Sequence, residues 1–334
     1  MKSRIKYWLV AVCLGVMPLA ALSFFPRATT AAGLWYVAPS GNDANDCQTA
    51  GTACKTINGA LGKAGTGDTV NVQIGTYTAP SGDQVVFITR SVTLLGGWDG
   101  AFSVQTGMSV VDGQGVRRGM TVSDTATVLA ERFVFRNGVV SDGTGGGGIR
   151  NLANLTLAQS RVTSNLADSL AGQGGGVYNT GILTLTETAI DNNTAMDGGG
   201  LLNLSLARVE VISSTINGNN AGDACCNGGG GGAGIHNDGE AVLVASTVSG
   251  NVMQGGFSGA GILNYGVLTM TNSTISNNRG GSGEGIYSSG SNEAIYNTTI
   301  SGNSGDGLSG AFGHTTLSNS ILSGNGVRDC HNDA

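Results

Sequence analysis

The sequence is poor in proline, in charged residues and in aromatic residues, and the distribution of proline is the most informative of these. Only 4 Pro occur in 334 residues, and none lies within residues 81–334. Proline cannot donate a backbone hydrogen bond, so it is excluded from the interior of a sheet. A flexible glycine-rich linker has no such requirement. The lack of proline therefore favours a long, continuous ladder of strands over disorder.

Charge is also scarce. Charged residues make up 11% of the chain, the formal net charge is −6, and no Lys follows Lys63. Binding to nucleic acid needs a basic surface, so we expect no nucleic-acid partner. A mean hydropathy of +0.08 together with so little charge excludes a highly charged disordered chain.

Long apolar runs are lacking except near the N-terminus. Basic residues within 2–6 precede an apolar run over 7–22, and small residues follow at 30–32. This pattern is typical of a secretory signal peptide, so we predict that residues 1–32 are a signal peptide and that the mature chain starts at Gly33. An uncleaved anchor is the alternative, although the run is short for a bilayer span. We expect a secreted or cell-surface protein without a membrane-spanning segment after signal removal.

What the sequence does contain is a glycine-rich repeat. One phrase recurs as GGGIRN, GGGVYN, GGGLLN, GAGIHN and GAGILN, and then in the altered forms GEGIYS and GDGLSG. Its apolar residue returns at intervals of 28, 24, 34, 27, 24 and 22 residues, at Ile149, Val177, Leu201, Ile235, Ile262, Ile286 and Leu308. Such a period indicates one supersecondary unit per repeat.

A second phrase, an apolar residue three positions before an Asn, runs in step with the first. It occurs at Val134/Asn137, Val162/Asn165, Ile190/Asn193, Ile216/Asn219, Val248/Asn251, Ile275/Asn278, Ile300/Asn303 and Leu322/Asn325. Between the two phrases lie segments such as LTLT at 183–186, which alternate apolar and β-branched polar residues. Alternation with period two predicts short strands, several in each repeat.

These features predict an all-β fold, a single-stranded right-handed parallel β-helix, which is a solenoid of about ten coils. Neighbouring coils would lie about 4.8 Å apart, with Leu, Ile and Val pointing inward and Thr and Ser outward. We expect the repeated Asn residues to adopt the left-handed turn conformation and to hydrogen-bond from coil to coil. Leucine-rich repeats have a similar length, but their helix and consensus are missing.

One β-helix domain is predicted over residues 33–334. An open solenoid end exposes strand edges and core, so caps are expected. Residues 33–68 are predicted to form an N-terminal cap, with a short capping helix over 54–64 because its apolar residues have helical spacing. The coils would occupy residues 69–334. No cap is evident at the C-terminal end, so either the sequence is truncated there or another element covers it.

Five cysteines follow the predicted signal peptide. An extracellular location permits disulfides, and Cys47 and Cys54 are predicted to form one that staples the N-terminal cap. The pairing of Cys225, Cys226 and Cys330 stays open. Cys225 and Cys226 lie in the longest repeat interval, which we interpret as an inserted loop.

Several segments carry a resemblance to a known family. They are WYVAPSGNDANDC at 35–47, GTGDTVNVQIGTY at 65–77, SVTLLGGWDGAF at 91–102, VVDGQG at 110–115 and FVFRNG at 133–138. The chain resembles secreted bacterial right-handed β-helix proteins of the pectin-lyase-like superfamily. The GGGI and IxxN phrases resemble the repeats of chlamydial polymorphic outer-membrane proteins, with Gly in place of their third-position Ala. The resemblance implies the β-helix fold and a location outside a bacterial cell.

The same resemblance raises the question of catalysis. Enzymes of this superfamily eliminate across uronate linkages with Ca²⁺ and an Arg or Lys base, or hydrolyse glycosides with paired acids. After Lys63 only Arg is available as such a base, and Arg150, Arg161, Arg208 and Arg279 occupy different phases of the repeat. The Asn-Thr-Asp, Asp-Asp and Gly-His-Gly phrases of the hydrolases are absent. We therefore favour a protein without catalytic residues.

Three aspartates form the best candidate metal site. Asp168, Asp197 and Asp223 each follow a repeat Asn by three or four residues, so neighbouring coils could bring them into one row. Carboxylate oxygens of this kind suit Ca²⁺, which is the one cofactor that we consider. The alternative is that these are solvated turn residues that keep the surface soluble.

A stripe of side chains is the candidate binding site. The residue between each inward apolar side chain and its Asn should face outward, and stacking would align Arg150, Tyr178, Leu202, His236, Leu263 and Tyr287. Such a strip suits a glycan or a protein partner. A covering loop, or the strand preference of Tyr, is the alternative explanation.

The sequence thus predicts a secreted or cell-surface binding or adhesion module that engages polysaccharide or a surface protein. Two alternatives remain open. One is a polysaccharide lyase or glycoside hydrolase, which rests on fold analogy alone. The other is a structural spacer within a larger surface protein.

Overall fold

The computed structural model describes residues 32–123, 125–168, 172–222, 230–255, 258–282, 284–290, 292–311 and 314–332. The predicted signal peptide, except its last residue, lies outside these ranges. Residues 32–334 form one compact unit. Apart from the 3-10 helix η1 (Ala50–Thr52) and the helix α1 (Ile57–Leu61), every described element of this unit is a strand.

The strands form four parallel sheets, which we name A to D. Sheet A contains β1 (Leu34–Val37), β2 (Thr69–Gln73), β5 (Val92–Trp98), β8 (Thr127–Glu131), β12 (Asn154–Ala158), β16 (Ile182–Thr186), β20 (Arg208–Ile212), β24 (Glu240–Val244), β28 (Val267–Thr271), β31 (Asn292–Tyr296) and β34 (His314–Ser318). Sheet B contains β3 (Gly75–Tyr77), β6 (Ser109–Asp112), β9 (Phe133–Arg136), β13 (Arg161–Thr163), β17 (Ala189–Asp191), β21 (Thr215–Asn217), β25 (Thr247–Ser249), β29 (Thr274–Ser276), β32 (Thr299–Ser301) and β35 (Ile321–Ser323). Sheet C contains β4 (Gln84–Ile88), β7 (Arg118–Val122), β11 (Ile149–Asn151), β15 (Val177–Asn179), β19 (Leu201–Asn203), β23 (Ile235–Asn237), β27 (Ile262–Asn264), β30 (Ile286–Ser289), β33 (Leu308–Ala311) and β36 (Cys330–Asn332). The short sheet D contains β10 (Val139–Val140), β14 (Leu166–Ala167), β18 (Thr194–Ala195), β22 (Asn220–Ala221) and β26 (Val252–Met253).

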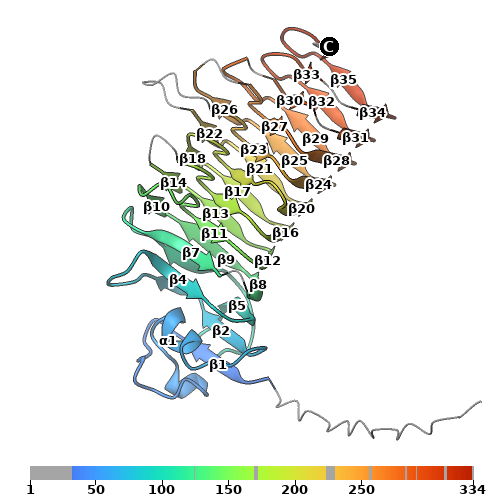
Figure 1. Cartoon of the computed structure of the whole chain (residues 1–334). Helices are drawn as coiled ribbons and strands as arrows, with labels where there is room; N and C mark the ends of the chain where they lie inside the picture. The colour runs from blue at the N-terminus through green and yellow to red at the C-terminus, as the bar shows by residue number, and fades with distance from the viewer. Residues whose placement is uncertain are drawn as a thin grey trace, which may run out of the picture. The chain divides into compact units, whose positions relative to one another are not determined.

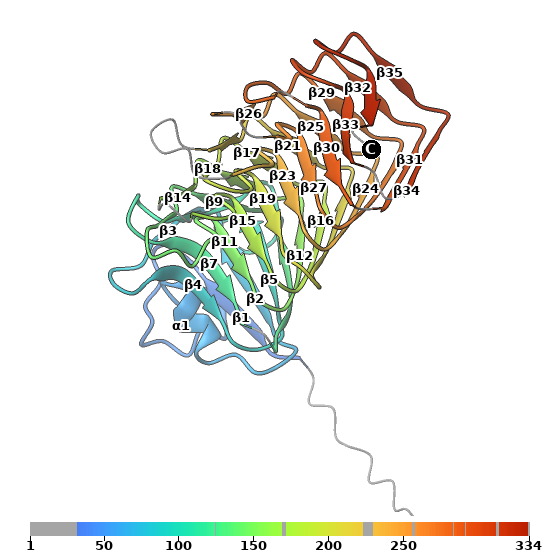
Figure 2. The ribbon, with the colours of Figure 1, turned by 45° about the horizontal axis from the view of Figure 1, so that its top comes forward.

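Each coil of the middle region visits the sheets in the order C, A, B and D. Strands β11, β12, β13 and β14 make one such coil, and β15 then returns to sheet C beside β11. Every strand pair is parallel because the chain always comes back in the same direction, and the stacked coils are visible in Figures 1 and 2. The fold is the predicted single-stranded right-handed parallel β-helix.

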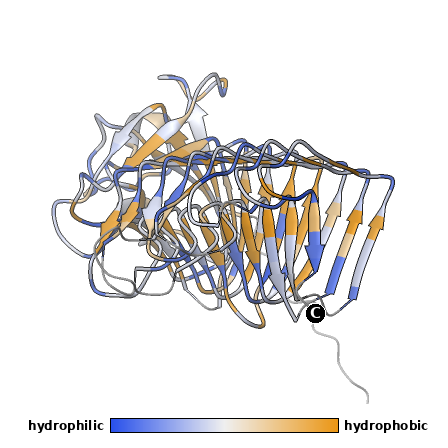
Figure 3. Ribbon diagram, turned by 90° about the horizontal axis from the view of Figure 1, so that it is seen from above, coloured by the Kyte–Doolittle hydropathy of each residue, from blue (hydrophilic) through white to orange (hydrophobic). Residues whose placement is uncertain are grey.

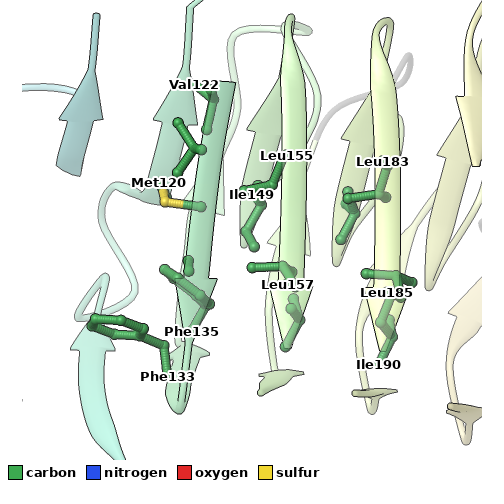
Figure 4. Close-up of a cluster of buried hydrophobic side chains, with 14 of the residues drawn as sticks. Met120, Val122, Phe133, Phe135, Ile149, Leu155, Leu157, Leu183, Leu185 and Ile190 are labelled. Atoms are coloured by element: carbon green, nitrogen blue, oxygen red, sulfur yellow. The ribbon is translucent and has the colours of Figure 1, made fainter. Parts of the chain in front are cut away.

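The apolar residues of both sequence phrases line the interior of these coils. All seven from the first phrase, Ile149 to Leu308, are at most 1% exposed, and so are those of the second phrase from Val162 to Ile300. Inward side chains of successive coils follow one another, as Leu155 and Leu183 do in Figure 4. Figure 3 shows the apolar colour concentrated on the strands. Each coil therefore shields the interior of its neighbour from water.

One member of the second phrase is out of register. Val134 pairs with Arg161, whereas Phe135 pairs with the inward Val162 and is itself buried. Gly138, and not Asn137, occupies the position that Asn165 holds in the next coil, since the Gly138 N–H donates to Asn165 Oδ1 at 2.8 Å. The interpretation of Val134/Asn137 as the first repeat is therefore wrong by one residue. The sequence FVFRN allowed either Val134 or Phe135 to be inward.

The repeated Asn residues form two buried ladders, as expected. In the first ladder each side-chain Nδ2 donates to the next Oδ1 at 2.7 or 2.8 Å, through Asn151, Asn179, Asn203, Asn237 and Asn264. In the second ladder the same bond measures 2.9 or 3.0 Å, through Asn165, Asn193, Asn219, Asn251, Asn278, Asn303 and Asn325. These amides satisfy backbone groups at the turns as well as one another, so the ladders fix the register of the coils.

The left-handed conformation expected for these Asn residues belongs instead to their neighbours. No ladder Asn has positive φ, but the residue before each member of the second ladder does, for example Asn192 at 55° and Gly218 at 64°. The turn is made one position earlier, which leaves the ladder amide free to point into the interior. The prediction of left-handed Asn was therefore wrong for the ladder positions.

The N-terminal cap is smaller than predicted. Helix α1 has five residues and not eleven, and Thr56 caps it by accepting a hydrogen bond from the Gly59 N–H at 2.9 Å. Strand β1 lies within the predicted cap but pairs with β2, so sheet A already begins at Leu34. The predicted disulfide between Cys47 and Cys54 is present, with a Cα–Cα separation of 5.0 Å.

Candidate functional site

The predicted stripe residues lie side by side on sheet C. Parallel pairing connects them in the expected order, Arg150, Tyr178, Leu202, His236, Leu263 and Tyr287. The same register continues to Phe87 and Thr121 at the N-terminal end and to Ser309 and His331 at the C-terminal end. We call these ten residues the sheet C row. Phe87 and Thr121 were missed because the coils before residue 149 lack the glycine phrase.

The middle of the row is covered, in contrast to the expected exposure of every member. Leu202 and Leu263 are only 1% and 4% exposed. The loops that return from sheet D to sheet C pass directly over them: a Cβ on Gly198 would lie 2.8 Å from Leu202 Cβ, and one on Gly231 would lie 2.1 Å from Leu263 Cδ2. Since only glycine lets the backbone approach so closely, these loops remove both leucines from the accessible surface.

The N-terminal part of the row is partly accessible, although Thr121 between Phe87 and Arg150 is buried. Phe87 is 44% exposed, and the Arg150 guanidinium lies 5.9 Å from the centre of the half-buried Tyr178 ring. Among the described residues Arg150 Nε has no hydrogen-bond partner. Burial lowers the pKa of the nearby Arg118, and the charge of Arg150 lowers it further. An aromatic surface and an unsatisfied guanidinium donor therefore occur together here.

His236, in the covered middle of the row, lies between two carboxylates. Its Nε2 is 3.1 Å from Asp238 Oδ1, and its Nδ1 is 3.5 Å from Asp197 Oδ1, which is long for a hydrogen bond. Asp197 Oδ1 also accepts from the Gly231 N–H at 2.9 Å. Although burial opposes the charged imidazole, Asp197 and Asp238 together raise the pKa of His236 to about 9. The charged His236 thus helps to hold the covering loop.

This arrangement predicts a pH-dependent stability. A histidine whose pKa rises from 6.5 when unfolded to about 9 when folded stabilises the folded state fully below pH 6.5. The contribution, about 3 kcal/mol, is lost as the pH rises towards and through 9. Urea unfolding of the protein and of His236→Gln at pH 6 and pH 9.5 measures it. The two proteins should differ at pH 6 and converge at pH 9.5, and a constant difference would contradict the assignment.

The three predicted calcium ligands do not form the expected row. Asp223 lies outside the described residues. Strands β14 and β18 pair Leu166 with Thr194, and continuing this register places Asp168 opposite Met196. Asp197 pairs instead with Gln173, in an isolated bridge. The offset of three residues after one Asn and four after the next puts the two carboxylates out of register. No group of three or more His, Cys, Asp or Glu side chains in the described ranges is arranged to hold a metal ion.

The C-terminal part of the row borders a cavity of about 300 Å³, which we call the C-terminal cavity. Tyr287, Ser309 and His331 reach it from sheet C, and Glu284, Asp306 and Arg328 reach it from the adjoining loops. Ser309 and His331 continue the register of the predicted stripe, but their repeats are altered and they were not included in it. Asp306 shares the sequence offset of Asp168, and it lies here and not near the other aspartates.

No helix within the described part of the chain is long and apolar enough to span a membrane. The search against protein-family models finds no match. The search of curated proteins likewise finds none.

Two solved structures are similar in fold. The crystal structure of pectate lyase Pel9A is 18% identical in sequence, with a TM-score of 0.49 over 85% of this chain and 69% of that chain. The A-module of the Azotobacter vinelandii mannuronan C-5 epimerase AlgE4 is 15% identical, with a TM-score of 0.39 over 79% of this chain and 88% of that one. At these identities no activity is transferred. The strand pairing itself defines the chain as a right-handed parallel β-helix protein, and this fold alone does not define a function.

Proposed function

We propose that the protein is a secreted or cell-surface binding module that engages polysaccharide along the N-terminal part of the sheet C row, without catalysing a reaction. The observation that carries the proposal is the alignment of Phe87, Arg150 and Tyr178 on the outer side of one sheet. The predicted signal peptide supports the location outside the cell.

The chemistry of this surface suits a saccharide chain. The exposed ring of Phe87 can pack against the apolar face of a sugar, and the half-buried Arg150 adds a positive charge along the row. The ring of Tyr178 is partly covered by the backbone at Gly145, so a sugar would contact its free edge. Neighbouring strands lie about 4.8 Å apart, so Arg150 is one step from Tyr178 and two steps from Phe87. A chain lying along the row meets these groups in succession. A protein partner is the alternative occupant and is separated by the test.

The test removes the two aromatic side chains. We expect Phe87→Ala with Tyr178→Ala to weaken binding to immobilised polysaccharides at least tenfold, because each ring contributes about 1 kcal/mol. Tyr296→Ala is the matched control, since Tyr296 is an exposed tyrosine on sheet A. Co-sedimentation with pectin, alginate, cellulose and mannan measures the binding.

Three results would overturn the proposal. Undiminished binding by the double variant would show that the sheet C row is not the binding site. Binding only to proteins would show that polysaccharide is not the ligand. Release of unsaturated or reducing oligosaccharides from any of these polymers would contradict a role without catalysis.

A further inference from the structure

The C-terminal cavity contains a buried hydroxyl that the fold does not use. Ser309 is 3% exposed, and its Oγ has no hydrogen-bond partner among the described residues. It lies between Tyr287 and His331 in the register of sheet C and lines the cavity. A buried hydroxyl without a partner costs about 1 to 3 kcal/mol of free energy. A ligand that forms a hydrogen bond with this hydroxyl would recover part of that cost as binding free energy.

The charged groups around this hydroxyl are arranged as a fixed polar wall. Arg328 holds both oxygens of Asp306, with Nε 3.2 Å from Oδ1 and Nη2 2.9 Å from Oδ2. Glu284 is buried and accepts a hydrogen bond from the Gly259 N–H at 3.0 Å through Oε2. Burial raises the pKa of Glu284, and the charge of Asp306 raises it further. The wall therefore offers accepting oxygens in fixed positions.

These groups select against an anionic ligand. Asp306 is negative, Glu284 is a second carboxyl group, and the Arg328 guanidinium is already occupied by Asp306. A carboxylate brought into the cavity would be repelled by Asp306, whose own charge already pairs with Arg328. Hydroxyl groups, in contrast, can donate to Asp306 and can exchange hydrogen bonds with Ser309 and Glu284. Tyr287 adds a ring beside them.

From this geometry we infer that the C-terminal cavity is a binding subsite for one neutral sugar residue, held by hydrogen bonds to Ser309, Glu284 and Asp306 and by contact with Tyr287. The inference rests on the proposed polysaccharide-binding function and adds a charge preference to it. A volume of about 300 Å³ lies at the lower end of the range of small-molecule sites, which fits a single ring and not a longer ligand.

The decisive variant is Ser309→Ala. Because Ser309 Oγ bonds nothing in the fold, its loss should leave the midpoint of thermal unfolding unchanged or slightly higher. The probes are the methyl glycosides of glucose, galactose, mannose and xylose, with galacturonic acid as the anionic comparison, titrated into the full-length protein by NMR. We expect at least one neutral glycoside to bind, with affinity about five- to tenfold lower in Ser309→Ala. Galacturonic acid should not bind at the cavity.

Ser301→Ala is the matched control, since Ser301 lies on sheet B of the preceding coil, and it should leave affinity unchanged. Equal affinity of Ser309→Ala and the wild type, or preferential binding of galacturonic acid, would overturn the inference. So would the absence of any glycoside binding.

These outcomes are distinct from those of the preceding test. Polymer binding that depends on Phe87 and Tyr178, without glycoside binding at Ser309, would leave the proposed function intact and remove only the subsite. Glycoside binding at Ser309 without polymer binding would contradict the proposed function and would support the subsite.

Discussion

Replacing Asn219 by alanine is expected to lower the free energy of unfolding by about 4 kcal/mol, because several buried polar groups lose their partners at once. Asn219 Nδ2 donates to Ile190 O and to Asn251 Oδ1, each at 3.0 Å. Its Oδ1 accepts from the Asn193 N–H and from Asn193 Nδ2, also at 3.0 Å. Alanine would remove all four of these bonds. Asn251 Oδ1 would keep only the Asn219 backbone N–H, and Asn193 Nδ2 would keep only Val162 O.

Asn217→Ala provides the matched control in the same turn. Asn217 is exposed, so its replacement should change the free energy of unfolding by no more than about 0.5 kcal/mol. Urea unfolding followed by circular dichroism measures both variants. A loss below about 1 kcal/mol for Asn219→Ala would mean that the ladder contributes little, and would contradict its role in fixing the register.

Ile190→Ala is expected to destabilise the protein by a similar amount, about 4 kcal/mol, for a different reason. Ile190 is fully buried between the inward Val162 and Ile216 of the neighbouring coils. Removing three carbon atoms leaves a cavity that the closely stacked coils cannot collapse to fill. Thr215→Ala, on the exposed side of the next strand, is the control and should cost less than about 1 kcal/mol. Comparable losses in both variants would show that Ile190 does not face the core.

Both Asn ladders end on carboxylates, which gives them a direction. In the first ladder Asn264 Nδ2 donates to Glu293 Oε1 at 3.1 Å, and in the second Asn325 Nδ2 donates to Asp329 Oδ1 at 3.0 Å. Every amide along the way donates towards the C-terminal coils. A chain of amides polarised in one direction presents an excess of positive charge at its donor end, which a carboxylate stabilises. This explains why a buried Glu293 follows the inward Leu268 in sheet A.

The repetition in the sequence was sufficient to predict the fold and the alignment of the stripe. Ile149 and Val177 had to be inward, and the same spacing then placed Arg150 beside Tyr178. The repeat could not predict what covers each position, because the loops between sheets D and C differ in every coil. Leu202 and Leu263 are covered by such loops, and their burial depends on a close backbone approach at Gly198 and Gly231 that composition does not reveal.

The local errors have a similar origin. Successive side chains of a strand point to opposite faces, so an error of one position changes which residue is inward. Such an error made Val134 and not Phe135 the predicted inward residue. A difference of one position in the turn likewise puts Asp168 and Asp197 out of register. The C-terminal cavity was missed because its groups come from repeats in which the phrases are altered. The Ser309 and His331 positions could have been found by extending the stripe at the same interval, but Glu284 and Arg328 come from loops with no repeated pattern.

Stacking of the coils in register is the claim on which the fold, the ladders and the sheet C row all depend. Thr156 and Thr269 are 113 residues apart in sequence, but they occupy the same outward position on sheet A four coils apart. Double electron–electron resonance between nitroxides at these two positions, with Cys225, Cys226 and Cys330 replaced by serine, measures their separation. A narrow distribution centred near 20 Å is expected from four steps of about 4.8 Å. A broad distribution, or one centred at twice that distance, would contradict the stacked coil.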